Sequence, residues 1–242
     1  SRRQRQMCIR DSLGATVHYR QGDSDEDRTA YGEVVLAAIG RVPNTDADWF
    51  RSSGLKLDER GYVTVDGYGR TNLDGVWALG DITPGHALAH RAFEQGITIA
   101  EKIAGADPKP VIDDTVPQVV FSFPEAASVG LTLDQAKALE DVVEPKETAY
   151  PMLSNARMLM SGEGGSMTVV SGAFANNPDM QVVLGVHIVS PIASDLIAEA
   201  EQLVGNRVPL ADAARLIHPH PTFSETLGEA LLKADGRPLH TR

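Results

Sequence analysis

The sequence predicts two kinds of architecture in one chain: an α/β part over residues 1–112, then an α+β domain built on an antiparallel sheet over residues 113–242. In the first part, short apolar runs that end in glycine accompany one long stretch with helical spacing, which is typical of buried strands and helices. A polar, proline-rich stretch at 106–117 marks a boundary, and beyond it strands follow one another with helices set to one side. A further boundary after residue 44 gives three predicted domains: 1–44, 45–112 and 113–242.

The composition limits the possible partners and locations. The 242 residues are 42% hydrophobic and 23% charged, as in ordinary globular proteins. The formal net charge of −11 disfavours nucleic acid and anionic membranes as partners, because both favour a basic face. The longest apolar run, at 34–39, is far shorter than the ~20 residues that span a bilayer. The single cysteine, Cys8, excludes a disulfide within this chain, and we expect a cytoplasmic location.

The first twelve residues, SRRQRQMCIRDS, differ from the rest of the chain. They are basic where the remainder is acidic, and they follow neither the helix period nor the strand period. We therefore expect residues 1–12 to be a foreign leader and the native protein to continue N-terminally. Cys8 lies in this stretch, so we assign its thiol no reactive role.

Segments of the first part match particular elements. The strand-like segments are TVHYR at 16–20, GEVVLAAIGR at 32–41 and VWALGDITPG at 76–85. Turn signals accompany a short helix in RVPNTDADWF at 41–50 and a short strand in GYVTVDGYGRTN at 61–72. Apolar residues at helical spacing, among them Phe93 and Ile103, predict a helix with a buried face over 87–105, which Gly105 ends.

The second part shows strand and helix patterns with different connectivity. The predicted strands are PQVVFSF at 117–123, ETAYPM at 147–152, GSMTVVSG at 165–172 and MQVVLGVHIVS at 180–190. The predicted helices are TLDQAKALE at 132–140, ASDLIAEAEQLVG at 193–205 and PLADAARLI at 209–217. This succession indicates helices packed on an antiparallel sheet.

Two glycines end predicted buried strands where a ligand could bind. Gly80-Asp81 would place a carboxylate at the edge of a sheet, next to the start of the helix over 87–105. Asp81 could accept hydrogen bonds from sugar-like hydroxyls, and the helix start would offer free N–H groups. Alternatively, Asp81 only caps a turn, which spacing alone favours. Gly40 likewise either lets the backbone approach a ligand or simply leaves the strand.

The segment HPHPTFSE at 218–225 combines two histidines with two prolines. Proline fixes φ and lacks an N–H, so this segment is a stiff arm rather than a helix or a central strand. A metal site would use His218 and His220, which point the same way in an extended chain, but no third ligand is close in sequence. Thr222 and Glu225 match a capping box. In a third interpretation, Glu225 orients His220 as a general base. The residues alone favour the capping interpretation without excluding the third.

Five motifs in order resemble the C-terminal half of the FAD-dependent pyridine nucleotide–disulfide oxidoreductases. They are GEVVLAAIGRVPNT, RTNLDGVWALGD, LAHRAFEQG, PEAASVGLT and HPHPTFSE, and the resemblance covers roughly residues 30–242. The ending, with a histidine two residues before His220 and a glutamate five residues after it, is most similar to the dihydrolipoamide dehydrogenase branch. SNAR at 154–157 also resembles this branch.

The resemblance implies a role for each matching position. Asp81 would bind the ribityl or phosphate portion of FAD, Ala89 would bind the flavin through its backbone, and Gly40 would line the NAD site. The neighbouring residues of the two FAD motifs are Gly80, Leu88 and His90. His220, held by Glu225, would reach across a two-fold homodimer to the redox disulfide of the partner and accept a proton from a dithiol, either a small molecule or a lipoyl domain.

Two parts of the family pattern do not occur in this chain: the GxGxxG phosphate-binding turn and a Cys-x4-Cys pair. Both normally lie N-terminal to the matched region, so the resemblance implies a C-terminal fragment that is inactive alone. The alternatives are a related flavoprotein reductase for glutathione or mycothione, and a non-catalytic dimerisation module.

Overall fold

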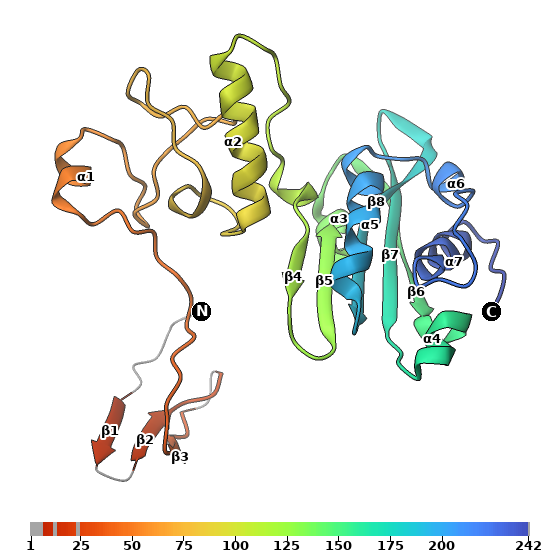
Figure 1. Ribbon diagram of the computed structural model, residues 1–242, viewed down its shortest axis with the longest axis horizontal. Coiled ribbons are helices and arrows are strands. Elements are labelled where there is room, and N and C mark those ends of the chain that lie inside the picture. The colour runs from red at the N-terminus through yellow and green to blue at the C-terminus, as the bar shows by residue number, and fades with distance from the viewer. Residues whose placement is uncertain (1–6, 12–13, 23–24, 242) are drawn as a thin grey trace. The chain divides into compact units, whose positions relative to one another are not determined.

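The computed structural model describes residues 7–11, 14–22 and 25–241 of the chain. The chain divides into two compact units, Ser1–Val42 and Pro43–Arg242 (Figure 1). None of the helices in the described ranges is both long and apolar enough to cross a lipid bilayer. The predicted domain boundaries after residues 44 and 112 stay predictions.

The first unit contains a small antiparallel sheet with the strand order β1-β2-β3. Its strands are β1 (Met7–Asp11), β2 (Gly14–Tyr19) and β3 (Arg28–Gly32). β2 confirms the predicted strand at 16–20. β1 lies within the expected leader, whose residues follow no strand period, and Met7–Asp11 pair with β2 along their whole length. Pairing with a neighbour decides strand formation here more than the alternation of side chains does. Residues 1–6 and 12 of the expected leader lie outside the described residues.

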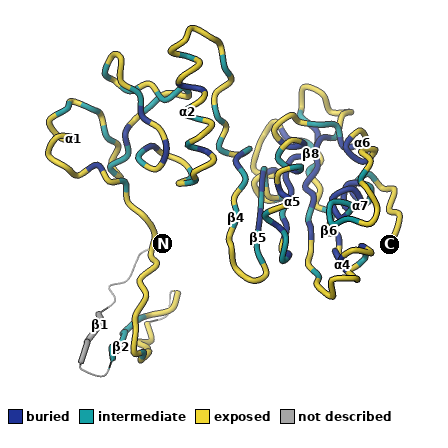
Figure 2. The backbone as a smooth tube through the Cα atoms, viewed as in Figure 1, coloured by how far each residue is buried: buried dark blue, intermediate teal, exposed yellow. Residues whose placement is uncertain are grey.

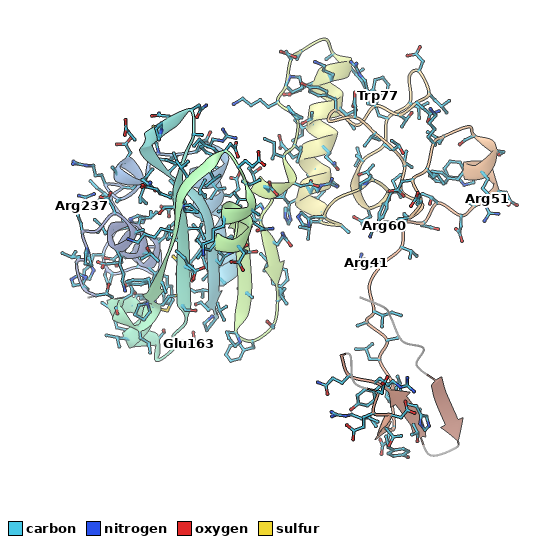
Figure 3. All side chains as sticks on the ribbon, turned by 180° about the vertical axis from the view of Figure 1, so that it is seen from behind. Arg41, Arg51, Arg60, Trp77, Glu163 and Arg237 are labelled. Atoms are coloured by element: carbon cyan, nitrogen blue, oxygen red, sulfur yellow. The ribbon has the colours of Figure 1, made fainter. Side chains whose placement is uncertain are left out.

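The predicted buried strand at 32–41 is wrong beyond Gly32. Residues 33–42 contain neither helix nor strand, and their apolar side chains are exposed, with Val34 at 86% and Leu36 at 88%. Figure 2 shows this segment as exposed, and Arg41 marks it in Figure 3. An apolar run becomes a buried strand only beside other strands, and among the described residues no strand pairs with this segment.

The second unit begins with the predicted turn and short helix, α1 (Asp48–Ser52). The predicted strands at 61–72 and 76–85 are wrong, because these segments form only the isolated bridges Leu57–Val63 and Arg70–Trp77. Gly80, with φ +72°, turns the chain out of the extended conformation into the short 3₁₀ helix η1 (Gly80–Ile82). A small apolar core still forms here from Phe50, Val63 and Ala78.

Helix α2 (Ala89–Ile103) confirms the predicted helix over 87–105, and Gly105 follows its end with φ +86°. Its buried face is narrower than the spacing predicted. Ile99 packs closely against Gly69, whereas Phe93 and Ile103 are 72% and 60% exposed. The buried residues of α2 are Arg91, Thr98 and Ile99, whereas Phe93 and Ile103 stay at the surface.

The α+β domain is confirmed and contains a five-stranded antiparallel sheet with the order β4-β5-β8-β7-β6. Its strands are β4 (Gln118–Val120), β5 (Glu125–Gly130), β6 (Val142–Pro151), β7 (Ser166–Phe174) and β8 (Asn177–Ser190). Four of them were predicted. β5 was not, because its residues EAASVG are mostly small and carry little strand signal.

Helices cover both faces of this sheet, which corrects the expectation that they lie to one side. α5 (Ala193–Gly205), α6 (Leu210–Ala213) and α7 (Glu225–Ala234) enclose the main core, in which Val183, Leu203 and Leu231 are buried (Figures 1 and 2). α3 (Leu133–Ala138) packs on a second cluster that contains Leu184. Adjacent strand residues point to opposite faces, which separates Val183 from Leu184. The remaining short helices are η2 (Asp113–Thr115), η3 (Met152–Ser154) and α4 (Ala156–Ser161). The predicted helix at 209–217 is reduced to α6.

Candidate active site

The histidine arm lies between α6 and α7, as its prolines predicted. Residues 215–224 contain no regular helix or strand, and α7 begins at Glu225. Pro219 and Pro221 each fix one φ angle, so few backbone torsions in the arm are free to change. The helix that follows the arm, α7, packs against β6 and β7, so the end of the arm is fixed relative to the sheet.

His220 and Glu225 form the pair that one interpretation predicted. Nδ1–H of His220 donates to Oε1 of Glu225 over 2.9 Å. The His220 side chain is 71% exposed, whereas that of Glu225 is only 20% exposed. The imidazole is therefore held at one nitrogen and presents the other outward.

Glu225 also carries part of the predicted cap. Its second oxygen, Oε2, accepts a hydrogen bond from the Thr222 backbone N–H over 2.7 Å. The Thr222 hydroxyl does not complete the box, because it donates to the Pro219 carbonyl instead. One carboxylate thus serves both predicted roles, with one oxygen for each.

The electrostatics keep this carboxyl ionised. Its burial disfavours the charged form, but the hydrogen bonds from Thr222 N–H and from His220 outweigh burial, so the pKa of Glu225 is lowered. A carboxylate on Nδ1 fixes the tautomer in which Nδ1 carries the hydrogen and Nε2 has a free lone pair. Nε2 of His220 can therefore accept a proton from a group that approaches from solvent.

The expectation that His218 and His220 point the same way is wrong. The His218 side chain is only 9% exposed, and its Nε2 lies 2.7 Å from Oε1 of Glu199 on α5. The two rings thus have separate carboxylate partners. No group of three or more His, Cys, Asp or Glu side chains that could hold a metal occurs among the residues the structure describes.

Four predicted cofactor positions lie around the start of α2. η1 packs against α2, and the Gly80 N–H donates to the side chain of Gln95 over 2.9 Å. Asp81 and Ala89 are both exposed beside this contact. Leu88 is the N-terminal cap residue of α2 and offers no side-chain hydrogen bond to the first turn. N–H groups of that turn have no partner within the helix, so they are suited to a ligand.

His90 and Gly40 lie differently. Nε2–H of His90 donates to the Pro117 carbonyl over 2.7 Å, which ties the start of α2 to the chain just before β4. Gly40, with φ +115°, belongs to the first unit and to the exposed segment 33–42. The role of Gly40 stays a prediction.

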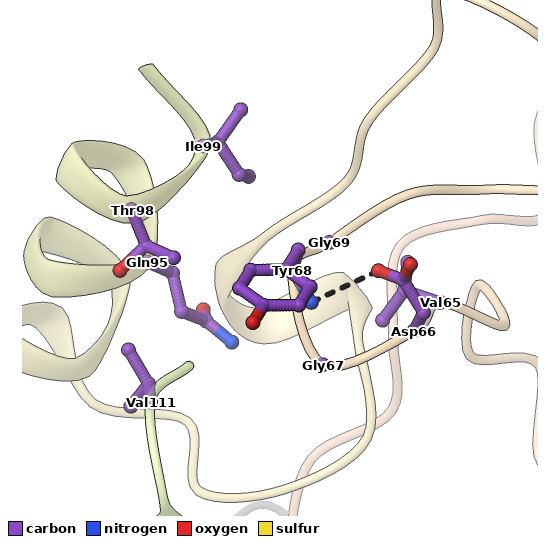
Figure 4. A pocket seen from close by; sticks show the side chains of 9 residues that line it. All are labelled: Val65, Asp66, Gly67, Tyr68, Gly69, Gln95, Thr98, Ile99 and Val111. Carbon is purple, nitrogen blue, oxygen red and sulfur yellow. Dashed lines mark hydrogen bonds between the residues drawn. The ribbon is translucent and has the colours of Figure 1, made fainter. Parts of the chain in front are cut away.

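A small pocket between α2 and the turn at 66–69 was not predicted (Figure 4). The Tyr68 backbone N–H donates to Asp66 Oδ1 over 2.9 Å and shapes the turn. Lys102 lies 4.5 Å from the centre of the Tyr68 ring. Gln95, which also lines the pocket, is the side chain that accepts from Gly80 N–H. The pocket is thus part of the packing that supports the predicted cofactor positions.

Sequence reasoning missed several residues that hold the arm. Asn155 is buried and donates through Nδ2 to the Thr222 carbonyl over 3.2 Å. Arg157 lies 5.4 Å from the centre of the Phe223 ring. SNAR was noted only as a resemblance, and nothing in its spacing indicates a contact between Asn155 and Thr222, which is 67 positions away. His240, for which no partner was predicted, pairs with Glu229 of α7 over 2.8 Å.

Comparison with known proteins identifies the family of this chain. The pattern described as pyridine nucleotide-disulphide oxidoreductase matches residues 9–96, and its dimerisation domain matches residues 116–231. The first match includes residues 9–12 of the expected leader, whose origin stays a prediction. The chain is 40% identical over 229 residues to a dihydrolipoyl dehydrogenase of Cupriavidus necator and 37% identical over 228 residues to one of Geobacillus stearothermophilus, covering 94% of this chain and 46% of the relative in each case.

A solved structure has the same fold. LpdA from Mycobacterium tuberculosis superposes with a TM-score of 0.82 at 30% identity, over 94% of this chain and 47% of that one. The chain therefore spans about half the length of the relatives it matches. The two family matches cover most of the described strands and helices, including the first half of α2, the five-stranded sheet and the arm. The chain belongs to the pyridine nucleotide-disulphide oxidoreductase family.

Proposed function

We propose that this chain is the C-terminal part of an FAD-dependent dihydrolipoamide dehydrogenase, a homodimer that oxidises dihydrolipoamide with NAD. The observation that carries the proposal is the His220–Glu225 pair, with an exposed imidazole whose Nδ1 is fixed on a carboxylate. The dihydrolipoyl dehydrogenases among the relatives support the choice of branch.

His220 acts as the general base in this proposal. Its Nε2 removes a proton from a thiol of the dithiol substrate, and Glu225 stabilises the imidazolium that results. The thiolate is the nucleophile that attacks a disulfide, because the neutral thiol reacts far more slowly. This chain has a single cysteine, Cys8, so it cannot form the redox disulfide by itself. The proposal assigns that disulfide to an N-terminal half outside this chain.

The residues around the start of α2 fit an FAD site. Asp81 is exposed and can accept hydrogen bonds from ribityl hydroxyls, and the uncapped first turn of α2 offers N–H groups. Gly80, with φ +72°, lets the chain turn beside α2, where its N–H meets the side chain of Gln95. The residues assigned to cofactors are Gly80, Asp81, Leu88, Ala89 and His90 for FAD, and Gly40 for NAD. When bound, these cofactors supply the two-electron redox chemistry.

The homodimer is part of the same proposal. Support comes from the match to a dimerisation domain and from apolar side chains left at the surface of the α+β domain. Phe121 and Phe123 are 80% and 85% exposed beside β4, and Ile217 is 97% exposed in the arm. We also infer a cytoplasmic location, which the single cysteine favours. Sedimentation of the full-length protein tests the homodimer, and a monomer at micromolar concentration would contradict it.

The deciding experiment replaces His220 with Gln in the full-length protein. Dihydrolipoamide oxidation is expected to be abolished, while the flavin absorbance shows that FAD stays bound. His240→Gln is the matched control, because His240 is also exposed and also paired with a glutamate of α7. Near-normal turnover of the His220 variant would refute the assignment. Assays with glutathione and mycothione disulfides separate the proposed substrate from those of related reductases.

A further inference from the structure

His218 occupies a closed site two residues before His220. Its Nε2–H donates to Oε1 of Glu199 over 2.7 Å, and the ring is almost fully covered. Glu199 lies in the middle of α5, which packs against β5 and β8. The contact therefore joins the beginning of the arm to an element that is fixed on the sheet.

The other side of the His218 ring rests on α7. A Cβ atom built at Gly228 would lie 2.5 Å from His218 Nδ1 and 2.9 Å from Cε1. Only glycine leaves room for the ring at this position of the helix. His218 is thus held between a carboxylate of α5 and the backbone of α7, and α7 is the helix that also carries Glu225.

The far end of the arm is fixed as well. Asn155 Nδ2 donates to the Thr222 carbonyl, and the Thr222 hydroxyl donates to the Pro219 carbonyl over 2.6 Å. Between these two anchored ends, Pro219 and Pro221 remove two backbone rotations. The position of His220 therefore depends on where its neighbours on both sides are held.

We propose that His218 and Glu199 are positioning residues for His220, an inference that rests on the proposed function. Neither one supplies or accepts the substrate proton. Their hydrogen bond, together with the glycine surface of α7, fixes the stiff arm so that Nε2 of His220 stands where the thiol arrives. A displacement of about 1 Å at a reacting group can lower a rate ~100-fold.

Gly228→Ala tests this inference without removing either polar partner. The added methyl group displaces the His218 ring, while alanine has a higher helix propensity than glycine. In the full-length holoenzyme, kcat for dihydrolipoamide oxidation is expected to fall about 10- to 100-fold, while the steric strain lowers the melting temperature by a few degrees. Gly205→Ala on α5 is the matched control, because a Cβ there meets only the flexible side chain of Glu201.

His218→Asn and Glu199→Ala test the pair itself and are expected to lower kcat to a similar extent. Glu199 is 37% exposed, so its variant keeps the test available if the buried histidine variant does not fold. His240→Asn is the control, because it breaks a histidine–glutamate pair on α7 that does not hold the arm. NADH oxidation by an artificial electron acceptor, which needs no thiol deprotonation, should stay within about twofold of wild type in every variant.

The outcomes separate this inference from the proposed function. If His220→Gln is inactive while Gly228→Ala and His218→Asn keep more than half of the wild-type kcat, the positioning inference alone is overturned. Equal decreases in both assays, accompanied by lower melting temperatures, would indicate only a structural role and would also overturn it. If His220→Gln keeps its turnover, the proposed function fails and the positioning role fails with it.

Discussion

Replacing Glu225 with Gln tests whether the carboxylate of Glu225 fixes the tautomer of His220. Both carboxylate oxygens accept a hydrogen bond: Oε1 from His220 Nδ1–H over 2.9 Å and Oε2 from Thr222 N–H over 2.7 Å. Glutamine has nearly the same shape, but one oxygen becomes an NH₂ group that can only donate. The amide therefore cannot satisfy both donors in either orientation.

The two orientations have different consequences. If the amide NH₂ faces Thr222, two donors meet and a hydrogen bond is lost, at a cost of about 1–3 kcal/mol. If it faces His220, Nδ1 must become the acceptor and the hydrogen moves to Nε2. The second orientation is favoured, because an exposed imidazole changes tautomer easily. Nε2 then has no free lone pair, so the contribution of the general base, about 10²- to 10⁴-fold, is lost.

The assay is the steady-state rate of dihydrolipoamide oxidation by the full-length protein, followed by the absorbance of NADH. We expect kcat/KM to fall about 10²- to 10⁴-fold, while the free energy of unfolding changes by less than about 1.5 kcal/mol. Glu229→Gln, four residues later on α7 and paired with His240, is the control and should keep its activity. A Glu225→Gln enzyme within about twofold of wild type would refute the tautomer argument.

Three further predictions concern stability. Because the hydrogen bond that His218 donates to Glu199 raises the pKa of His218, this pair stabilises the fold fully below the unfolded histidine pKa of ~6.5 and loses that effect as pH rises through the folded pKa. The difference in unfolding free energy between wild type and Glu199→Gln, measured in denaturant, should therefore shrink as pH rises. Leu231→Ala removes a fully buried side chain and should cost about 2–5 kcal/mol in the same measurement. Gly162→Ala, at φ +70° in open space, should lower the free energy of unfolding by about 1–2 kcal/mol. Gly130→Ala should lower it clearly more, because at φ +78° the added Cβ also meets a backbone oxygen. Equal losses in the two variants would contradict the steric argument.

Local patterns predicted the elements whose partners are near in sequence. The helix over 87–105 ends at Gly105, a signal that lies within the segment itself. His220 and Glu225 are five residues apart, close enough in sequence for their side chains to form a hydrogen bond. The strands β7 and β8 are joined by a tight turn, so each supplies the neighbour that the other needs. In these cases the physical cause of the structure lies within about fifteen residues.

Contacts with distant residues could not be predicted in the same way. His218 turns inward because Glu199 and Gly228 form a site for it, and neither residue marks itself as a partner in the sequence. The buried strands expected at 32–41 and 76–85 did not form, because an apolar run specifies burial but not the strand beside it.

The two histidine–glutamate pairs on α7 show why function depends on more than the pair itself. His220 and His240 each donate Nδ1–H to a glutamate, over 2.9 and 2.8 Å, and Glu225 and Glu229 are one helical turn apart. Both imidazoles are mostly exposed. They differ in their support: two prolines and the buried His218 brace the first, whereas a single proline, Pro238, precedes the second. A general base must return to one position at every turnover, so the braced pair is the one suited to catalysis, and variants that loosen only the brace should separate position from basicity.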